Sequence, residues 1–277
     1  MSENTINNAI ESAYTLPGSF YTDEEIFDSM KEKVFARSWQ LTTTTDSVKT
    51  VNSAYPFFFM PDFLEEPLLL TRNEDDQLNC ISNVCTHRGN ILIQNATSCR
   101  KIVCGYHGRK FDMTGQFESM PSFKDVENFP SETDNLTKIP FSTFRQFIFT
   151  SLSPAYSFSE ITEVLERKVG FLDFASFTED PSKHRIYIVK AHWALYCDNY
   201  LEGFHIPFVH PGLNQVLDAK DYTTELHRYL NIQIGIAEEG VEAFDLPPDH
   251  EDHGKRIAAY YFWIFPNLML NFYPWGL

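Results

Sequence analysis

Positive charge is scarce in this 277-residue chain, which has 22 Lys and Arg against 38 Asp and Glu and a formal net charge of −16. A nucleic-acid partner needs clustered Lys and Arg to neutralise its phosphates, and the sequence contains no such run. The composition therefore excludes a nucleic-acid-binding surface. An acidic excess of this size is typical of a solvated face that keeps a protein soluble.

Long apolar runs are also absent. The richest one, AYPFFFMPDFLEEPLLL at residues 54–70, is interrupted by three prolines and three acidic residues, so it cannot span a bilayer. It predicts two strands joined by a turn instead. The N-terminus, MSENTINNAIESAY, lacks the basic start and apolar core of a secretory signal. We therefore expect no membrane partner and a cytoplasmic location.

Cysteine is sparse, and its count of five is odd. In a chain expected to be cytoplasmic, this number favours metal ligands and free thiols over a disulfide framework. Hydrophobic residues make up 43% of the sequence and charged residues 22%, which is ordinary for a globular protein. The length suffices for one large domain or two ordinary ones.

Two regions with different patterns open the chain. Residues 20–39 predict a helix, because apolar side chains recur at helical spacing and Thr22 or Asp23 is suited to cap the first turn. From about residue 39 to 151, short runs rich in Val, Ile, Phe and Thr alternate with Gly, Pro, Asn and Asp clusters. This alternation predicts a compact all-β module.

The remainder of the chain predicts both helix and strand. Residues 159–172 have the pattern of a second helix with Ser159 as its cap, and residues 185–195 read as a strand. Residues 226–237 and the C-terminal stretch predict further strands, separated by a loop around 243–255 that we expect to be exposed.

A first set of metal-binding residue types lies inside the all-β module. Cys85 and His87 form a C-x-H pair, Cys104 and His107 form a C-x-x-H pair, and residues 88–103 separate the pairs. Thiolate and imidazole bind both zinc and iron–sulfur centres. Zinc fingers usually pair Cys with Cys and His with His, whereas each pair here is mixed. A two-iron cluster, with two thiolates on one iron and two imidazoles on the other, accounts for the mixture better than structural zinc does.

The motif C-x-H-x16-C-x2-H, flanked as CTHRG and CGYHG, closely resembles the Rieske [2Fe–2S] domain. The resemblance implies that these two Cys and two His hold the cluster, whose potential in such domains lies roughly between −150 and +300 mV. It continues through residues 108–121, where Asp112 to Gly115 predict a turn between strands. Cys80 and Cys99 fall outside the pattern and are expected to be buried or incidental thiols.

A second set of such residues lies in DNYLEGFHIPFVH, at residues 198–210. On a helix, Asp198, Glu202 and His205 share one face. His210 lies five residues beyond His205, about 500° of rotation and therefore about 140° away, so a regular helix cannot bring both rings to one ion. Pro207 lies between them and removes an interior hydrogen bond, so we expect a kink that lets the rings converge.

The stretch N-Y-x-E-x-x-H-x4-H is similar to the mononuclear-iron motif of Rieske non-haem iron oxygenase α subunits, the aromatic-ring-hydroxylating dioxygenase family. The resemblance implies that His205 and His210 are iron ligands, to which a carboxylate is added to form a facial triad. It also implies that Glu202 is the catalytic acid that links the iron to the Rieske cluster of a neighbouring subunit. Glu at this position, where ring-hydroxylating members often have Asp, resembles the choline and carnitine oxygenase branch.

The resemblance implies an α+β chain, in which an all-β Rieske domain accompanies an α+β helix-grip (START/Bet v 1-like) catalytic domain. The family's third iron ligand is an Asp that would lie beyond Leu277, so we expect the catalytic domain to be incomplete at its C-terminus. Asp245 and Asp249 match no ligand context. The expected divisions are an N-terminal helical segment packing on the catalytic domain (1–38), the Rieske domain (39–152) and the partial catalytic domain (153–277).

The implied enzyme uses a [2Fe–2S] cluster and mononuclear Fe(II) to activate O2 and to hydroxylate or demethylate a small organic substrate, with a quaternary amine favoured. The alternatives are an arene-dihydroxylating dioxygenase and a Rieske electron-transfer protein without oxygenase activity. An NAD(P)H-dependent reductase or ferredoxin as electron donor and a homotrimeric assembly are implied too. A set of aromatic residues suits either an ammonium-binding cage or the core: Tyr200, Phe204, Phe208, Trp263 and Trp275.

Overall fold

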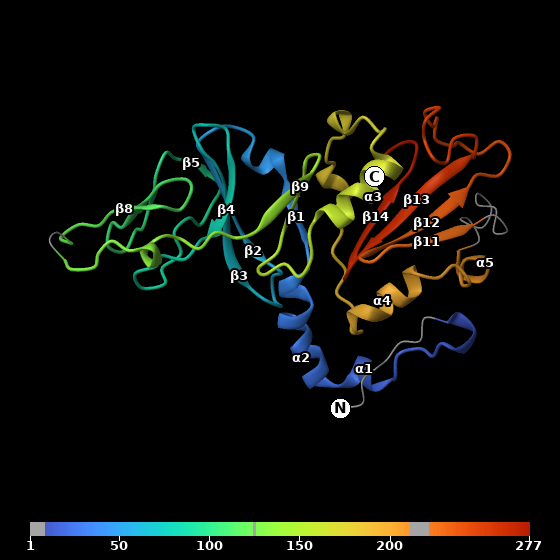
Figure 1. The fold of residues 1–277 in the computed structure, drawn as a ribbon, viewed down its shortest axis with the longest axis horizontal. Helices are drawn as coiled ribbons and strands as arrows, with labels where there is room; N and C mark the ends of the chain where they lie inside the picture. The colour runs from blue at the N-terminus through green and yellow to red at the C-terminus, as the bar shows by residue number, and fades with distance from the viewer. Residues whose placement is uncertain (1–8, 124–125, 211–221) are drawn as a thin grey trace. The chain divides into compact units, whose positions relative to one another are not determined.

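The structure is a computed structural model that describes residues 9–123, 126–210 and 222–277 (Figure 1). The chain divides into two compact units, one formed by Phe35–Phe158 and the other by Met1–Val34 together with Ser159–Leu277. Among the helices in these ranges, none is both long enough and apolar enough to cross a membrane.

The unit Phe35–Phe158 is built from short antiparallel strands, as the alternating sequence predicts. They form three sheets, with the strand orders β1-β10-β9, β4-β3-β2-β5 and β6-β7-β8. The strands are β1 (Gln40–Thr44), β2 (Ser53–Phe59), β3 (Glu66–Arg72), β4 (Leu78–Ser82), β5 (Thr97–Ser98), β6 (Ile102–Val103), β7 (Lys110–Phe111), β8 (Phe117–Ser119), β9 (Phe141–Phe144) and β10 (Phe147–Thr150), accompanied by the 3₁₀ helices η2 (Phe35–Arg37), η3 (Thr45–Val48) and η4 (Glu132–Asp134).

Strands β2 and β3 are the two strands predicted within residues 54–70, and they pair antiparallel. Strand β3 has apolar side chains on both faces because each face contacts a different core. Leu69 packs in the cluster that contains Cys85, whereas Leu68 and Leu70 pack in a second cluster with Val48. Burial on both sides explains why the usual polar–apolar alternation is missing here.

The other unit contains one antiparallel sheet of order β11-β12-β13-β14, drawn in orange to red in Figure 1, together with the α-helices. Asp23 caps α2 by accepting hydrogen bonds from the N–H groups of Glu25 and Ile26, which confirms one of the two predicted caps. The elements are η1 (Ile10–Ser12), α1 (Ser19–Thr22), α2 (Glu24–Lys33), α3 (Ser159–Val169), η5 (Phe174–Ser176), η6 (Pro181–Lys183), α4 (Trp193–Tyr200), α5 (Ile206–Val209), β11 (Thr223–Leu226), β12 (Leu230–Ile236), β13 (Ile257–Ile264) and β14 (Leu268–Phe272).

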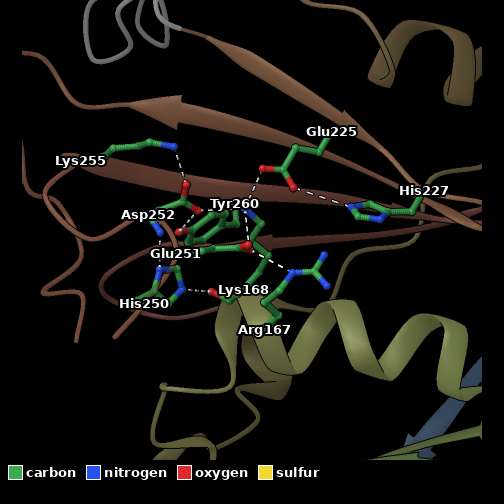
Figure 2. Close-up of polar contacts among 9 residues, drawn as sticks. All are labelled: Arg167, Lys168, Glu225, His227, His250, Glu251, Asp252, Lys255 and Tyr260. Atoms are coloured by element: carbon green, nitrogen blue, oxygen red, sulfur yellow. Dashed lines mark hydrogen bonds and ion pairs between the residues drawn. The ribbon is translucent and has the colours of Figure 1, made fainter. Parts of the chain in front are cut away.

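The two faces of this sheet meet different helices. Tyr261 of β13 packs in a cluster with Tyr200 of α4. Its neighbour Tyr260 points to the opposite face and donates a hydrogen bond to Asp252, which pairs with Lys168 of α3 (Figure 2). The face that α4 covers is next to the segment that contains the second set of candidate metal ligands.

The prediction of a strand over residues 185–195 is wrong. Among the described residues, 184–190 pair with no strand, and the side chains of Ile186 and Ile188 are 92% and 95% exposed. The rest of the segment begins α4, because His192 accepts a hydrogen bond from the N–H of Ala194 and caps the helix. The β-branched pattern is a propensity only, and a strand forms only where a partner strand supplies the hydrogen bonds.

The loop around 243–255 is less exposed than expected. Phe244, Leu246 and Asp252 are buried at 8%, 7% and 2% exposure. The expectation fails because the loop folds back on the sheet, where the Asp252 carboxylate lies 3.0 Å from Lys168 Nζ.

Candidate metal centres

The two Cys–His pairs lie in turns of the same construction. In the first, the N–H of Cys85 donates to the carbonyl of Asn90 (2.9 Å) and the N–H of Gly89 donates to the carbonyl of Cys85 (3.0 Å). The second turn repeats both bonds at the same spacing, from Cys104 to the carbonyl of Arg109 (2.8 Å) and from Gly108 to the carbonyl of Cys104 (3.0 Å).

Glycine is required at the same place in both turns. Gly89 and Gly108 have φ values of +70° and +69°, in the left-handed region where a side chain is disfavoured. The C-x-H and C-x-x-H pairs thus lie in turns with the same backbone hydrogen bonds, although their Cys-to-His spacings differ.

The predicted ligands of these turns pair by type, because the thiols of Cys85 and Cys104 are hydrogen-bonded to each other and the two imidazoles are adjacent. The rings of His87 and His107 lie 4.8 Å apart between centroids, and both Cys85 and Cys104 are only 2% exposed. The Nδ1 atom of His107 is buried and, within the described part of the chain, has no hydrogen-bond partner. Because an unpaired buried nitrogen is costly, this lone pair suits a metal ligand. The residues present therefore fit a [2Fe–2S] cluster with mixed thiolate and imidazole ligands.

The electrostatic setting favours the metal-binding protonation state at Cys104 and His87, whereas burial raises the pKa of the Cys85 thiol. Desolvation opposes ionisation of Cys104, but hydrogen bonds from the N–H groups of Tyr106 and His107 outweigh it and lower the pKa of its thiol. Desolvation, followed by repulsion from His107, lowers the pKa of His87. Thiolate and neutral imidazole are the forms that coordinate a metal ion. The amide of Asn90, from the other turn, donates to Cys104 Sγ at 3.7 Å.

A buried cation beside this site was not predicted. Arg109 is only 3% exposed, forms an ion pair with Asp134, and places its guanidinium 4.8 Å from the centroid of the Phe117 ring. Its charge contributes to lowering the pKa of His87, after desolvation, His107 and the adjacent Arg88. The spacing of the motif carries no signal for it, since an Arg beside a Lys in GRKF reads as an exposed residue.

The second set of residues does not lie on one helix, so the prediction of a shared face is wrong. Helix α4 ends at Tyr200, and Glu202 lies in the following turn. Asp198 remains in α4, where it accepts a hydrogen bond from the hydroxyl of Tyr21 (2.6 Å) that raises the pKa of Tyr21 to about 12. Pro207 lies in the first turn of the separate helix α5, where its missing N–H is harmless, rather than in a helix interior.

The two imidazoles nevertheless converge as expected. His205 and His210 flank the short helix α5, and their ring centroids lie 5.1 Å apart with planes at 76°. The convergence comes from a complete break between two helices rather than from a kink in one.

Glu202 fixes the orientation of the first of these rings. Its Oε1 lies 2.5 Å from Nδ1 of His205, and its Oε2 accepts hydrogen bonds from the N–H groups of Phe204 and His205. Partial burial opposes ionisation, but the hydrogen bond with His205 and the two N–H groups lower the pKa of Glu202. A carboxylate bound to one ring nitrogen of His leaves the other nitrogen free for a metal.

The donor set of two imidazoles suits ferrous iron when a carboxylate is added. In residues 9–123, 126–210 and 222–277, no three His, Cys, Asp or Glu side chains are grouped closely enough to hold a single metal ion, so these residues supply no third ligand beside His205 and His210. The carboxylate ligand of the iron, expected beyond Leu277, stays a prediction.

The five aromatic residues that the sequence assigns either to an ammonium-binding cage or to the core differ in burial. Phe204 and Phe208 are each 86% exposed and Trp275 is 71% exposed, so the core interpretation is wrong for these three. Tyr200 is half-buried and its hydroxyl hydrogen-bonds to Asn271 (2.6 Å), while Trp263 contacts Phe265 edge to face.

Comparison with protein families matches both parts of the chain. The profile of the Rieske [2Fe-2S] domain matches residues 38–130, and that of the ring hydroxylating alpha subunit (catalytic domain) matches residues 174–277. The chain belongs to the Rieske non-haem iron oxygenase α subunits. It is therefore an oxidoreductase of the oxygenase type, with a Rieske cluster and a mononuclear non-haem iron as its cofactors. The catalytic-domain match sets aside the interpretations as an electron carrier or a zinc protein.

Relatives of this α subunit include enzymes named for quaternary amines. The carnitine monooxygenase oxygenase subunit of Escherichia coli (strain K12) is 28% identical, over 95% of this chain and 69% of that protein. The chloroplastic choline monooxygenase of Arabidopsis thaliana is 27% identical, over 96% of this chain and 64% of that protein. The chain thus spans about two thirds of the length of these relatives.

Solved structures confirm the predicted α+β fold. A crystal structure of a quaternary ammonium Rieske monooxygenase with an inhibitor has a TM-score of 0.70 and 25% identity, covering 95% of this chain and 69% of the other. Naphthalene 1,2-dioxygenase from Rhodococcus sp. bound to indole has a TM-score of 0.71 and 20% identity, covering 95% and 66%. The second likeness shows the fold alone.

Proposed function

We propose that this α subunit oxidises a small quaternary ammonium compound with dioxygen. The observation that carries the proposal is the convergence of His205 and His210 beside Glu202, in a chain similar over most of its length to carnitine and choline monooxygenases. Glu at position 202, rather than the Asp often found in ring-hydroxylating members, supports the same branch.

Each predicted site residue has a role in this proposal. Cys85, His87, Cys104 and His107 hold the cluster, and His205 and His210 hold the iron. When bound, the cluster supplies electrons and the iron activates dioxygen. Glu202 orients His205 and links the iron site to the cluster of a neighbouring subunit.

The wider setting follows from these roles. An NAD(P)H-dependent reductase or a ferredoxin supplies electrons, and a homotrimer supplies the neighbouring cluster. One relative's structure is described as revealing inter-subunit electron transfer, which supports this arrangement. We further infer a cytoplasmic location, a Rieske domain at 39–152, and a catalytic domain from 153 with the helical segment 1–38 packed on it.

A substrate panel tests the proposal. The reconstituted chain with a reductase is supplied with ¹⁸O2 and with carnitine, choline, γ-butyrobetaine, indole or naphthalene. We expect oxygen consumption coupled to product only with the quaternary amines, with one labelled atom per product. Coupled turnover restricted to the arenes, with two labelled atoms, would favour the dihydroxylating dioxygenase instead.

His205→Ala separates the two metal sites. We expect this variant to keep the Rieske spectrum of the unaltered chain and to lose oxygen-dependent turnover, because only the mononuclear site loses a ligand. Turnover that survives the substitution would show that His205 is not an iron ligand.

A further inference from the structure

Gln233 is a polar residue in an apolar strand. It lies in the middle of β12, whose sequence is LNIQIGI, and it is only 2% exposed. A buried amide is unfavourable unless both its donor and its acceptor have partners. The partners of this amide therefore indicate what it does.

Both ends of the amide are hydrogen-bonded toward the iron-ligand segment. Its Nε2 donates to the carbonyl oxygen of Tyr200 at 2.5 Å, and its Oε1 accepts from the hydroxyl of Tyr222 at 2.9 Å. Tyr200 is the last residue of α4, so its carbonyl is one of those that a helix end leaves without an intrahelical partner. Gln233 supplies the missing donor.

Tyr222 carries the contact onward to the turn between α4 and α5. A Cβ atom built on Gly203 would lie 3.5 Å from Cε1 of Tyr222, so the ring lies against the backbone at this residue. Gly203 is directly after Glu202 and two residues before His205. Burial, and then the nearby Tyr273 and Glu202, raise the pKa of Tyr222, so its hydroxyl stays protonated and donates to Gln233.

The side chain of Tyr200 is held independently. Its hydroxyl lies 2.6 Å from Oδ1 of Asn271 and 3.2 Å from the carbonyl oxygen of Phe262. These contacts fix the end of α4 to β13 and β14, while Gln233 fixes it to β12. The turn that follows thus starts from a rigid point and is braced by Tyr222.

We propose that Gln233 is a positioning residue for the mononuclear iron site, acting through Tyr200 and Tyr222 to set the place of His205. The inference rests on the proposed function, because it assumes that His205 binds the iron. Residues that orient metal ligands without touching the metal typically change metal affinity 10–100-fold when they are removed.

Three variants test this role. Gln233→Met keeps the length of the side chain and removes both hydrogen bonds. Tyr222→Phe removes only the hydroxyl of a half-buried residue and carries little risk to folding. Asn231→Leu is the matched control, because Asn231 lies on the same face of the same strand, is 7% exposed, and has a buried Oδ1 with no hydrogen-bond partner in the described residues.

The main readout is Fe(II) affinity of the full chain, measured by competition with a chromophoric chelator. We expect Gln233→Met to weaken it about 10–100-fold and Tyr222→Phe to weaken it in the same direction. The double variant should be no weaker than Gln233→Met alone, because both act in one chain of contacts. Asn231→Leu should change it less than about 3-fold. The visible spectrum of Co(II) bound in place of Fe(II) should shift only in the first two variants.

The outcomes separate this inference from the proposed function. If the unaltered chain shows no Fe(II) binding that depends on His205, the iron site itself is wrong and the inference falls with it. If such binding exists and Gln233→Met leaves affinity and Co(II) spectrum unchanged, the inference alone is wrong. A lower Tm with unchanged metal affinity would likewise show that Gln233 is only structural.

Discussion

At the scale of single residues, the two arginines beside the cluster site differ in burial. Arg88 follows His87 and is exposed, whereas Arg109 follows His107 by two residues and is only 3% exposed. Solvent screens an exposed charge, while a buried charge acts over several ångströms with little screening. Arg109 should therefore influence the redox properties of the cluster, since a nearby positive charge favours the reduced state.

Substitutions on either side of this ion pair should shift the Rieske midpoint potential in opposite directions. We expect Arg109→Met to lower it and Asp134→Asn to raise it, each on the order of 50 mV. Arg88→Gln is the exposed control and should shift it much less. A redox titration followed by EPR measures all three, and equal shifts at Arg88 and Arg109 would contradict the role of burial.

Cys104→Ala should abolish the visible colour and the low-g EPR signal of the Rieske centre. In the proposed site its thiolate is one of the two ligands of one iron, so we expect no cluster to form without it. Cys80→Ala is the control, because this buried thiol lies outside the site and burial raises its pKa to about 12. Iron and acid-labile sulfide analysis provides a second check, and an unchanged spectrum in the Cys104 variant would contradict the ligand assignment.

The residue types of the candidate ligands were predictable because metal coordination restricts them to Cys, His and acids at fixed spacing. Arg109 and Gln233 were not, since nothing in their local sequence shows that they are buried. A Gln between isoleucines reads as the solvent-facing position of a strand. Only the packing of α4 across that face makes it a buried hydrogen-bonding residue.

At the scale of elements, the segment 198–210 shows how side chains end a helix. Its residues suit one helix with a kink, yet the carboxylate of Glu202 accepts hydrogen bonds from two N–H groups of the turn. Acidic side chains that bind the backbone in this way compete with helix continuation. The sequence pattern therefore predicted correctly that His205 and His210 approach each other. It predicted incorrectly that a kink within one helix brings them together.

Helix α3 is joined to the sheet by a buried charge cluster, shown in Figure 2. Lys168 is 1% exposed, and its Nζ lies 2.7, 2.9 and 3.0 Å from carboxylate oxygens of Glu225, Glu251 and Asp252. Lys255, on the exposed side, also contacts Asp252 at 2.6 Å. Lys168 thus links acids from β11 and from the loop before β13, and Arg167 and Lys255 share in neutralising the acids of the loop.

Lys168→Met should lower the free energy of unfolding by about 3–5 kcal/mol at neutral pH, because it removes the buried cation from Asp252 and leaves this buried carboxylate with only the largely exposed Lys255. Lys255→Met, at a largely exposed lysine on the same Asp252, should lower it by less than about 1 kcal/mol. Urea denaturation measures both. Equal effects of the two substitutions would contradict the importance of burial.

The effect of Lys168→Met should also depend on pH. Burial opposes ionisation of Asp252, but hydrogen bonds from Lys255 and Lys168 outweigh it and lower its pKa to about 2. A depressed carboxyl pKa contributes stability above the unfolded value near 4, and this contribution is lost as the pH falls toward 2. The difference in free energy of unfolding between the unaltered chain and the Lys168→Met variant should therefore become smaller below about pH 4.

At the scale of the whole molecule, the two candidate metal sites belong to different compact units, Phe35–Phe158 and the unit that contains Ser159–Leu277. Glu202 is 33% exposed in its side chain and ionised, with its pKa lowered by His205 and backbone N–H groups against the opposing effect of burial. An acid of this kind can accept a hydrogen bond from another subunit while it orients His205.

Glu202→Gln should slow electron arrival at the mononuclear iron about 10-fold or more while both metals remain bound. Single-turnover kinetics with a pre-reduced cluster measure the rate of cluster oxidation. Metal analysis of the same sample serves as the control. Unchanged kinetics would contradict the linking role of Glu202.

The all-β character of residues 39–151 and the helices at 24–33 and 159–169 were predictable, because turn residues and apolar spacing encode them locally. The state of residues 185–191 was not, because pairing depends on a partner strand distant in sequence.

The hydrogen bond from Asn90 to Cys104 Sγ ties the first Cys–His turn to the second. Neither half of the cradle is complete alone, so loading with iron and sulfide should be an all-or-nothing event. A titration with iron and sulfide should populate cluster-free and cluster-loaded molecules without a partly assembled species. A substitution in either turn should lower the fraction of loaded molecules and leave the spectrum of each loaded molecule unchanged.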